Sequence, residues 1–498
     1  MSSETRRRGI AGERRARAAT AATAAIGVSA LLTIVIGLLG PSPMVPALDG
    51  PAWQPPYSLA VHPDPHLAVA LAAAAIVVGG LGLLAALILP DQAAAPDVRL
   101  LVKLGCLAAA VLAFLPPSGS GDHLNYAAYG RMLTLGLNPY THGAADLAGD
   151  PIADAVERPW REEPSVYGPV ATAVQAFASW VGGDSMRLTV FVLALVNAAA
   201  FVVTGLLLDR ATRHDEAARR RAALLWTANP LLLYHLVAGL HADTLAVACM
   251  VAALLARGRP AGGGVLLGLG VAVKVNAGLV ALGPAWELRR RPGRLAVMAG
   301  CALAVVAAGY AVAGPEAIAP VTRTSKSISH ATVWKLVQGW LQVVVGPGKA
   351  YRGEIQVGSL LLLALLAWLL LRWAARGGWG DAIGSAPVVA AGLAVAYVFA
   401  SPYVLPWYDG LAFGMLALVA ASAVDGFLVV HLLVLSLAYL PARVDGQPAD
   451  LAWLSGEVRP RTGWVLLVLT IALAVWAWRA AARGRRPRAS AAPPPSAP

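Results

Sequence analysis

Long hydrophobic runs recur along most of the chain. The run from Leu67 to Leu89 contains no charged residue. As a helix with a rise of about 1.5 Å per residue, it is long enough to cross the roughly 30 Å hydrocarbon core of a bilayer. Polar and charged residues gather between the runs. The pattern predicts an all-α polytopic membrane protein with about 14 transmembrane helices.

The charges beside each run give the direction of the expected spans, because Lys and Arg are held on the cytoplasmic side. We expect spans near residues 20–40, 66–89, 100–117, 186–208, 222–238, 243–257, 261–274, 276–288, 294–313, 355–374, 385–401, 406–422, 426–440 and 463–480. This assignment places the arginine-rich segments 210–221, 289–294 and 372–376 inside. It predicts a multi-pass protein of the cell inner (plasma) membrane with both termini in the cytoplasm.

Three parts of the chain follow from this topology. Residues 1–19 form a basic cytoplasmic tail, and residues 20–482 form the transmembrane domain. Residues 483–498 are basic and then rich in Pro, Ala and Ser, which cannot build a core. We expect them to be a disordered cytoplasmic tail.

Two large loops, residues 118–185 and 314–354, are expected on the outer side. This topology requires that the apolar segment Gly168 to Val181 does not span. Its boundaries, Tyr167-Gly168-Pro169 and Gly182-Gly183, suit a short helix that lies at the outer interface or re-enters the membrane.

The composition excludes a soluble domain. Of the 498 residues, 58% are hydrophobic and 13% are charged, against about 25% charged in a typical soluble domain. The net charge of +12 follows the topology, so we do not expect nucleic-acid binding. The three cysteines, Cys106, Cys249 and Cys301, are not spaced as a metal or redox pair. No nucleotide-binding glycine loop is present, which disfavours a nucleotide-driven mechanism.

Asp122 is the candidate general base. It follows Ser118-Gly119-Ser120-Gly121 at the outer end of the third expected span. A carboxylate partly shielded at a membrane surface can have its pKa tuned and can accept a proton from a sugar hydroxyl. The alternative is that Asp122 only caps a helix that begins near residue 123, and the local sequence favours this alternative.

Polar and aromatic residues of the same loop are candidates for binding substrate. Aromatic faces pack on sugar C–H groups, while His, Asn and Arg bond to hydroxyl groups, but the same residues suit the aromatic belt of any membrane protein. The candidates are His123, Tyr126, Arg131, Asn138, Tyr140 and Tyr167.

A second group of outward candidates lies later in the chain. His241 and Asp243 stand in a very short loop, where Asp243 could instead cap the next helix and His241 could be solvated. Tyr403 and Trp407 belong to a proline-broken turn that could wall an active site or be a packed turn.

Four basic residues are candidates for binding a phosphate. Lys274 interrupts an apolar stretch and could reach a phosphate at the outer headgroup level or only extend to the interface. Arg323, Lys326 and His330 lie on an outward loop, against the usual charge bias, and so call for an anionic partner. That partner is either a lipid headgroup or the phosphate of a bound lipid substrate.

The order of these motifs resembles a known enzyme family. The run from Asp122 to Tyr140 contains D-x-x-x-Y-x-x-x-G-R and G-x-N-P-Y elements. They are followed by Tyr167-Gly168-Pro169, Asn229-Pro230-Leu231, Gly239 with His241 and Asp243, and Lys274. This order resembles the GT-C fold of polyprenol-phosphomannose-dependent α-1,6-mannosyltransferases of actinobacterial lipomannan biosynthesis. The resemblance covers residues 118–290, and the C-terminal half only by its pattern of spans.

The resemblance implies an inverting mannosyltransferase. Asp122 matches the catalytic aspartate, the donor would be polyprenyl-phosphate-mannose, and the acceptor would be a glycolipid or mannan at the outer face of the membrane. Many GT-C enzymes carry two adjacent acids where this chain has Asp122-His123, so no metal site is assigned there. The sequence leaves open a divalent cation at His241 and Asp243.

Other functions compete with this one. A transporter or flippase for a lipid-linked glycan would also have many spans, but it should show two related halves with charges near the bilayer midplane, and no such repeat is found. A GT-C enzyme for another sugar, such as arabinofuranose, and a non-catalytic scaffold stay open. Besides donor and acceptor, membrane lipids are the expected partners.

Overall fold

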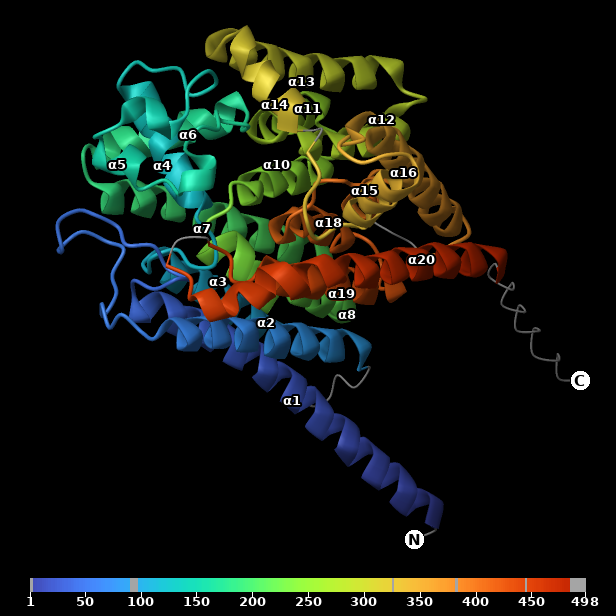
Figure 1. Cartoon of the computed structure of the whole chain (residues 1–498). Helices are drawn as coiled ribbons and strands as arrows, with labels where there is room; N and C mark the ends of the chain where they lie inside the picture. Colours follow the sequence, from blue (N-terminus) through green and yellow to red (C-terminus); the bar gives the residue numbers. More distant parts are fainter. Residues whose placement is uncertain (1–2, 90–96, 325–326, 381–383, 444–445, 484–498) are drawn as a thin grey trace, which may run out of the picture.

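The computed structural model describes residues 3–89, 97–324, 327–380, 384–443 and 446–483 (Figure 1). In these residues all regular structure is helical, apart from an isolated antiparallel bridge between Ser42 and Val45. The expected all-α fold is confirmed.

The α-helices follow one another through the whole described chain. They are α1 (Ser3–Leu39), α2 (Pro65–Ile88), α3 (Val98–Ala113), α4 (Asp122–Thr134), α5 (Pro151–Asp154), α6 (Pro169–Gly182), α7 (Met186–Thr212), α8 (Glu216–Leu225), α9 (Pro230–Leu232), α10 (Asp243–Leu255), α11 (Pro260–Val273), α12 (Leu282–Leu288), α13 (Pro292–Ala313), α14 (Ile318–Thr324), α15 (Val333–Val344), α16 (Arg352–Ala375), α17 (Ser385–Ala400), α18 (Asp409–Leu416), α19 (Ala423–Tyr439) and α20 (Arg459–Arg483). Short 3₁₀ segments are η1 (Ala144–Leu147), η2 (Arg158–Trp160), η4 (Val275–Ala281), η5 (Pro315–Ala317), η6 (Pro406–Tyr408) and η7 (Ala449–Leu451). Two π-helical segments are η3 (Leu233–Ala238) and η8 (Leu454–Val458).

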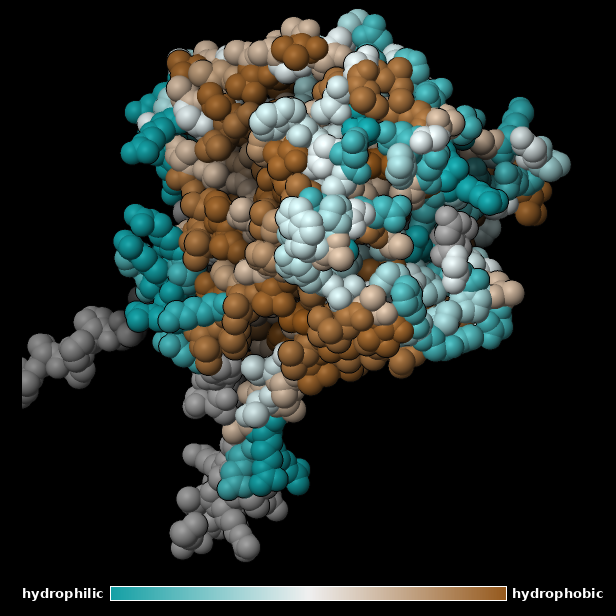
Figure 2. Space-filling view, turned by 90° about the vertical axis from the view of Figure 1, so that its left-hand side faces the viewer, coloured by the Kyte–Doolittle hydropathy of each residue, from teal (hydrophilic) through white to brown (hydrophobic). Residues whose placement is uncertain are grey.

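Hydrophobic side chains cover much of the outer surface. Six helical segments in the described residues are long and apolar enough to cross a membrane: Ala16–Leu39 of α1, α2, α7, α13, α16 and Ala449–Arg483, which contains α20. Figure 2 shows hydrophobic residues in a broad continuous area that runs from the top to the bottom of one face. Surfaces of this kind mark contact with lipid or protein rather than with water. The polytopic membrane class is confirmed, and the number of spans stays a prediction.

Several expected spans are broken helices. The expected span 222–238 holds the last turn of α8, which ends at Leu225, and then α9 and η3. Asn229 causes the restart, because its side-chain oxygen accepts hydrogen bonds from the backbone N–H groups of Leu231 and Leu232. Pro230 stands at the first position of α9, where its missing N–H costs nothing. The expected spans 276–288 and 406–422 also divide, into η4 with α12 and into η6 with α18.

The first expected outward loop, residues 118–185, folds into helices. Its apolar segment forms α6, so the expected short helix is confirmed, while its place relative to the membrane stays a prediction. Figure 1 places α4, α5 and α6 together at the upper left, far from the start of α1 and the end of α20. The expected topology requires this separation of the loop from both ends of the chain.

Helix α4 is fixed against α6 by a glycine. A Cβ atom at Gly130 would overlap the backbone carbonyl of Gln175 in α6. Only glycine lets the two backbones approach this closely. Since Asp122 is the first residue of α4, this contact helps to fix the position of its carboxylate.

Candidate active site

Asp122 is not the cap of its helix. Gly121 occupies the cap position of α4 and makes no side-chain cap hydrogen bond, whereas the backbone N–H of Asp122 donates to the Ser120 hydroxyl over 3.1 Å. The cap interpretation favoured by the local sequence is therefore wrong. The carboxylate is free for other contacts.

The Asp122 carboxylate is partly buried at the start of α4. Its Oδ2 atom is 3.6 Å from Nε2 of His241, and its side chain is 22% exposed while that of His241 is fully buried. The Tyr126 side chain lies close enough to lower the pKa of the carboxylate. The carboxylate therefore stays accessible from one side.

Burial raises the pKa of Asp122 to about 6. The positive charge of Lys274 opposes this shift, and the negative charges of Asp243 and Glu157 add to it. A carboxylate with this pKa is ionised at neutral pH and still basic enough to take a proton from a hydroxyl group in a transition state. These are the properties of a general base.

His241 presents an unprotonated nitrogen to Asp122. Its Nδ1 atom lies 2.5 Å from the carbonyl oxygen of His235, so Nδ1 carries the proton and donates it. Burial lowers the pKa of His241, which keeps the ring neutral. Nε2 then has a lone pair and no hydrogen-bond partner among the residues that the structure describes. Two acceptors, Nε2 and the Asp122 carboxylate, thus face each other over 3.6 Å.

The His241 ring is held in place by Trp407 of η6. The two rings stack with centroids 3.6 Å apart and an angle of 15° between their planes. Trp407 in turn meets the edge of Tyr439 at 5.2 Å. The expected alternative in which His241 is solvated is wrong, since the ring is enclosed by these contacts.

Lys274 and Asp243 form an ion pair beside Asp122. Lys274 follows the last residue of α11, and its Nζ atom lies 2.7 and 2.8 Å from the two carboxylate oxygens of Asp243. Nζ also lies 3.8 Å from the centre of the Tyr408 ring. Asp243 does not cap α10, because Ala242 is at the cap position and the Asp243 side chain bonds to Lys274. Lys274 is accordingly engaged inside the protein rather than extended to the interface.

Four expected aromatic residues converge on this cluster. The hydroxyl groups of Tyr126 and Tyr167 are 3.0 Å apart, and their rings meet edge to face. Tyr403 lies close enough to Asp122 for the carboxylate charge to raise its pKa, after the larger effect of burial. With Trp407 these tyrosines surround the cluster with aromatic rings, a residue type that packs on sugar rings.

His123 and Arg131 of α4 do not join the cluster. His123 is fully buried, and in the described part of the chain neither of its ring nitrogens has a hydrogen-bond partner. Arg131 lies nine residues after Asp122, about 13 Å along the helix, and pairs with Asp150 at 2.8 Å and Asp184 at 2.7 Å. We leave both residues out of the proposed site.

Asn138 and Tyr140 shape the loop after α4. The Asn138 side-chain oxygen accepts the backbone N–H of Tyr140 over 2.9 Å, and the Tyr140 hydroxyl lies 2.8 Å from that of Thr172 in α6. These contacts tie the loop to α6. The structure does not bring either side chain to Asp122.

Of the three cations expected on residues 314–354, only His330 has its side chain in the described part of the chain. His330 is exposed on the surface between α14 and α15. Arg323 lies in α14, but its side chain is outside the described part, as is all of Lys326. Their role at a donor phosphate stays a prediction.

Glu157 and Arg443 are partners of the site that the sequence did not reveal. Arg443 Nε lies 2.5 Å from Glu157 Oε1, and Glu157 is 5% exposed. A Cβ atom at Gly121 would lie 3.2 Å from the Glu157 carboxyl carbon. Glu157 therefore packs against Gly121, the residue before Asp122. No local signal identifies this pair, because the two residues are far apart in the chain and neither belongs to a motif.

Among the described residues, no group of three or more His, Cys, Asp or Glu side chains could hold a metal ion. The oxygens of Asp243 that would join His241 in such a site bond to Lys274 instead.

Comparison with known proteins relates this geometry to a family. The model of the family described as alpha-(1->6)-mannopyranosyltransferase, N-terminal domain, matches residues 24–290, more than half of the chain. Asp122, His241, Asp243 and Lys274 all lie within the matched region.

Curated relatives carry the same description. Alpha-(1->6)-mannopyranosyltransferase A of Corynebacterium glutamicum is 28% identical over 64% of this chain and 70% of its own. Alpha-(1->6)-mannopyranosyltransferase B of the same organism is 25% identical over 54% of this chain and 41% of its own. Alpha-(1->6)-mannopyranosyltransferase A of Mycobacterium tuberculosis is 28% identical over 59% of this chain and 60% of the relative's length. The match thus spans less than two thirds of the length of the last two relatives. The chain belongs to the α-(1→6)-mannopyranosyltransferase family of glycosyltransferases.

Proposed function

We propose that the chain transfers mannose from polyprenyl-phosphate-mannose to a mannan or lipomannan-type acceptor, with inversion and formation of an α-(1→6) linkage. Family membership supports the sugar and the linkage. The apolar helices support a donor that is delivered from the bilayer. We further propose that the reaction takes place at the outer face of the plasma membrane, with both chain termini in the cytoplasm.

The observation that carries the proposal is the pair of acceptors formed by Asp122 and His241. A sugar hydroxyl can donate to the Asp122 carboxylate, which is 22% exposed, because the unprotonated Nε2 of the buried His241, 3.6 Å away, gives that carboxylate no competing donor. In the proposed step the hydroxyl oxygen attacks the anomeric carbon of the donor, its proton passes to the Asp122 carboxylate, and the bond from that carbon to the phosphate oxygen breaks. Polyprenyl phosphate leaves with the electron pair of that bond.

The leaving phosphate develops negative charge that a cation must stabilise. Lys274 is the cation that acts on Asp122 in the structure, and we propose that it shares its charge between Asp243 and the phosphate. Arg323, Lys326 and His330 are proposed to assist from the second loop.

The test is transfer by the purified chain with mannosyl-phosphoryl-polyprenol and short α-mannoside acceptors. Asp122→Asn keeps the shape of the side chain but removes the base, and we expect a loss of about 10²- to 10⁴-fold in the rate. Asp184→Asn is the matched control, because this carboxylate is 90% exposed and pairs with Arg131, away from the cluster.

Two outcomes would contradict different parts of the proposal. Full transfer by Asp122→Asn would remove Asp122 from the role of base. No transfer by the unchanged chain from any polyprenyl-linked sugar, together with movement of the lipid-linked sugar across vesicles, would favour a flippase.

A further inference from the structure

A basic hollow lies at the start of α3, the end of that helix that is farther from Asp122. A cavity of about 540 Å³ is lined by residues from the start of α3, the end of α7 and the start of α8: Arg99, Leu206, Asp209, Arg210, Arg213, His214 and Arg219. Asp122 follows the opposite end of α3, which is about 24 Å long at 16 residues. The cavity is therefore separate from the candidate active site.

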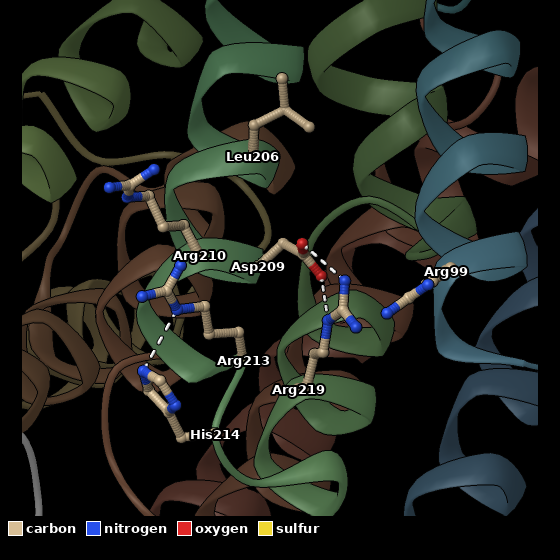
Figure 3. Close-up of a pocket in the computed structure, with 7 residues that line it drawn as sticks. All are labelled: Arg99, Leu206, Asp209, Arg210, Arg213, His214 and Arg219. Carbon is tan, nitrogen blue, oxygen red and sulfur yellow. Dashed lines mark hydrogen bonds and ion pairs between the residues drawn. The ribbon is translucent and has the colours of Figure 1, made fainter.

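The lining carries an excess of positive charge. Four arginines stand against one carboxylate, and Asp209 is already bonded to Arg219 over 2.5 and 2.8 Å. Arg213 donates to the His214 ring over 3.1 Å. Arg99 and Arg210 make no ion pair with any residue in the described part of the chain. Figure 3 shows Arg99 pointing from α3 toward Arg219, so two guanidinium groups approach each other.

Like charges gathered in one hollow repel each other unless an anion enters. A phosphate group suits guanidinium groups, which bind its oxygens through paired N–H donors. The charge alone would fit either a free phosphate or the headgroup of a lipid.

Apolar side chains next to the hollow favour the lipid. Leu206 is 52% exposed and stands one helical turn before Arg210 on α7. On α3, which packs against α7, exposed leucines continue away from Arg99 at one helical face: Leu100 at 46%, Leu104 at 52% and Leu107 at 58%. A basic hollow at the helix ends thus continues into an apolar surface along two helices, as the headgroup and acyl chains of a phospholipid require.

We propose that this hollow binds the phosphate headgroup of an anionic phospholipid, with Arg99 and Arg210 as its ligands and the acyl chains along α3 and α7. Basic pockets between membrane helices are a known way to hold such headgroups. The guanidinium groups of Arg99 and Arg210 would bind the phosphate of the headgroup. The exposed leucines would contact the acyl chains, which inorganic phosphate lacks.

The experiment measures lipid binding to the full chain purified in detergent, by native mass spectrometry with phosphatidylglycerol, phosphatidylcholine or inorganic phosphate. We expect one phosphatidylglycerol to bind more tightly than phosphatidylcholine. In Arg99→Gln/Arg210→Gln its apparent Kd should rise roughly 30-fold, because two contacts to the anionic headgroup are lost. Both side chains are exposed, so the variant should fold.

The matched control is Arg290→Gln/Arg291→Gln, which removes two exposed charges from the segment between α12 and α13. Equal weakening in this control would show a general charge effect and overturn the proposal. Equal binding of phosphatidylcholine would overturn it as well. Displacement of phosphatidylglycerol by an equal concentration of inorganic phosphate would make the hollow a free-anion site instead.

Discussion

The ammonium nitrogen of Lys274 lies 2.7 and 2.8 Å from the two carboxylate oxygens of Asp243, although the residues belong to the ends of different helices. Their side chains are only 14% and 7% exposed. The two charges act on Asp122 in opposite directions, since Lys274 lowers its pKa and Asp243 raises it. The pair is therefore both a structural contact and an electrostatic control on the candidate base.

Removing one member of this pair should destabilise the protein. Lys274→Met leaves the Asp243 carboxylate buried without a partner, and we expect a loss of about 3–5 kcal/mol in the free energy of unfolding. Lys274→Met/Asp243→Leu removes both charges and should recover most of that loss. Unfolding in detergent measures both variants, and a double variant no more stable than Lys274→Met would contradict the ion-pair interpretation.

The rate of mannosyl transfer should depend on the ionisation of Asp122. Since its pKa is about 6, kcat/KM should fall about tenfold for each pH unit below 6. Asp243→Asn removes a neighbouring negative charge, so the midpoint should move to lower pH. Lys274→Met removes a positive charge, so the midpoint should move to higher pH. Rate profiles from pH 4.5 to 8.5 measure these shifts, and shifts of the opposite sign would exclude Asp122 as the titrating group.

Asp122 should reduce stability at neutral pH. Its pKa rises from an ordinary 3.8 to about 6 in the folded protein, so the folded state binds more protons between these values. The contribution of this group is then favourable to folding at low pH and is lost as pH rises through about 6. At pH 8 we expect Asp122→Asn to be more stable than the unchanged chain by up to about 3 kcal/mol.

The difference in stability between Asp122→Asn and the unchanged chain should shrink to near zero at about pH 4, where the carboxyl group of Asp122 is protonated in the folded protein. Thermal unfolding at pH 4 and pH 8 measures this. Asp184→Asn should show no such gain, because its carboxylate is exposed. If Asp122→Asn gains the same stability at both pH values, ionisation of Asp122 is not the cause of the gain.

The contact between α4 and α6 should be required for activity. Gly130→Ala places a Cβ atom against the Gln175 carbonyl, and we expect it to move α4, destabilise the protein by about 1–3 kcal/mol and lower kcat/KM. Gly262→Ala in α11 is the matched control, because nothing lies within 4 Å of its added Cβ. It should be neutral or stabilise by up to about 1 kcal/mol. Unfolding and transfer assays on both variants test this, and an active, stable Gly130→Ala would refute it.

Much of the fold follows from the chain alone. Runs such as Leu67 to Leu89 are apolar over the thickness of a bilayer, so their helical state is fixed by the need to satisfy every backbone hydrogen bond in lipid. The break at Asn229-Pro230 does not follow from the sequence, because a proline inside an apolar run can either kink a helix or begin a new one.

The residues of the candidate site follow from the sequence, but the contacts between them do not. The sequence predicted Asp122, His241, Asp243 and Lys274 as residues of interest, since polar groups in an apolar chain are costly and local motifs mark them. It could not predict that Lys274 pairs with Asp243, that His241 faces Asp122, or that Glu157 packs below Gly121 with Arg443. Each of these contacts joins segments far apart in the chain, and only the packing of whole helices brings them within a few ångströms.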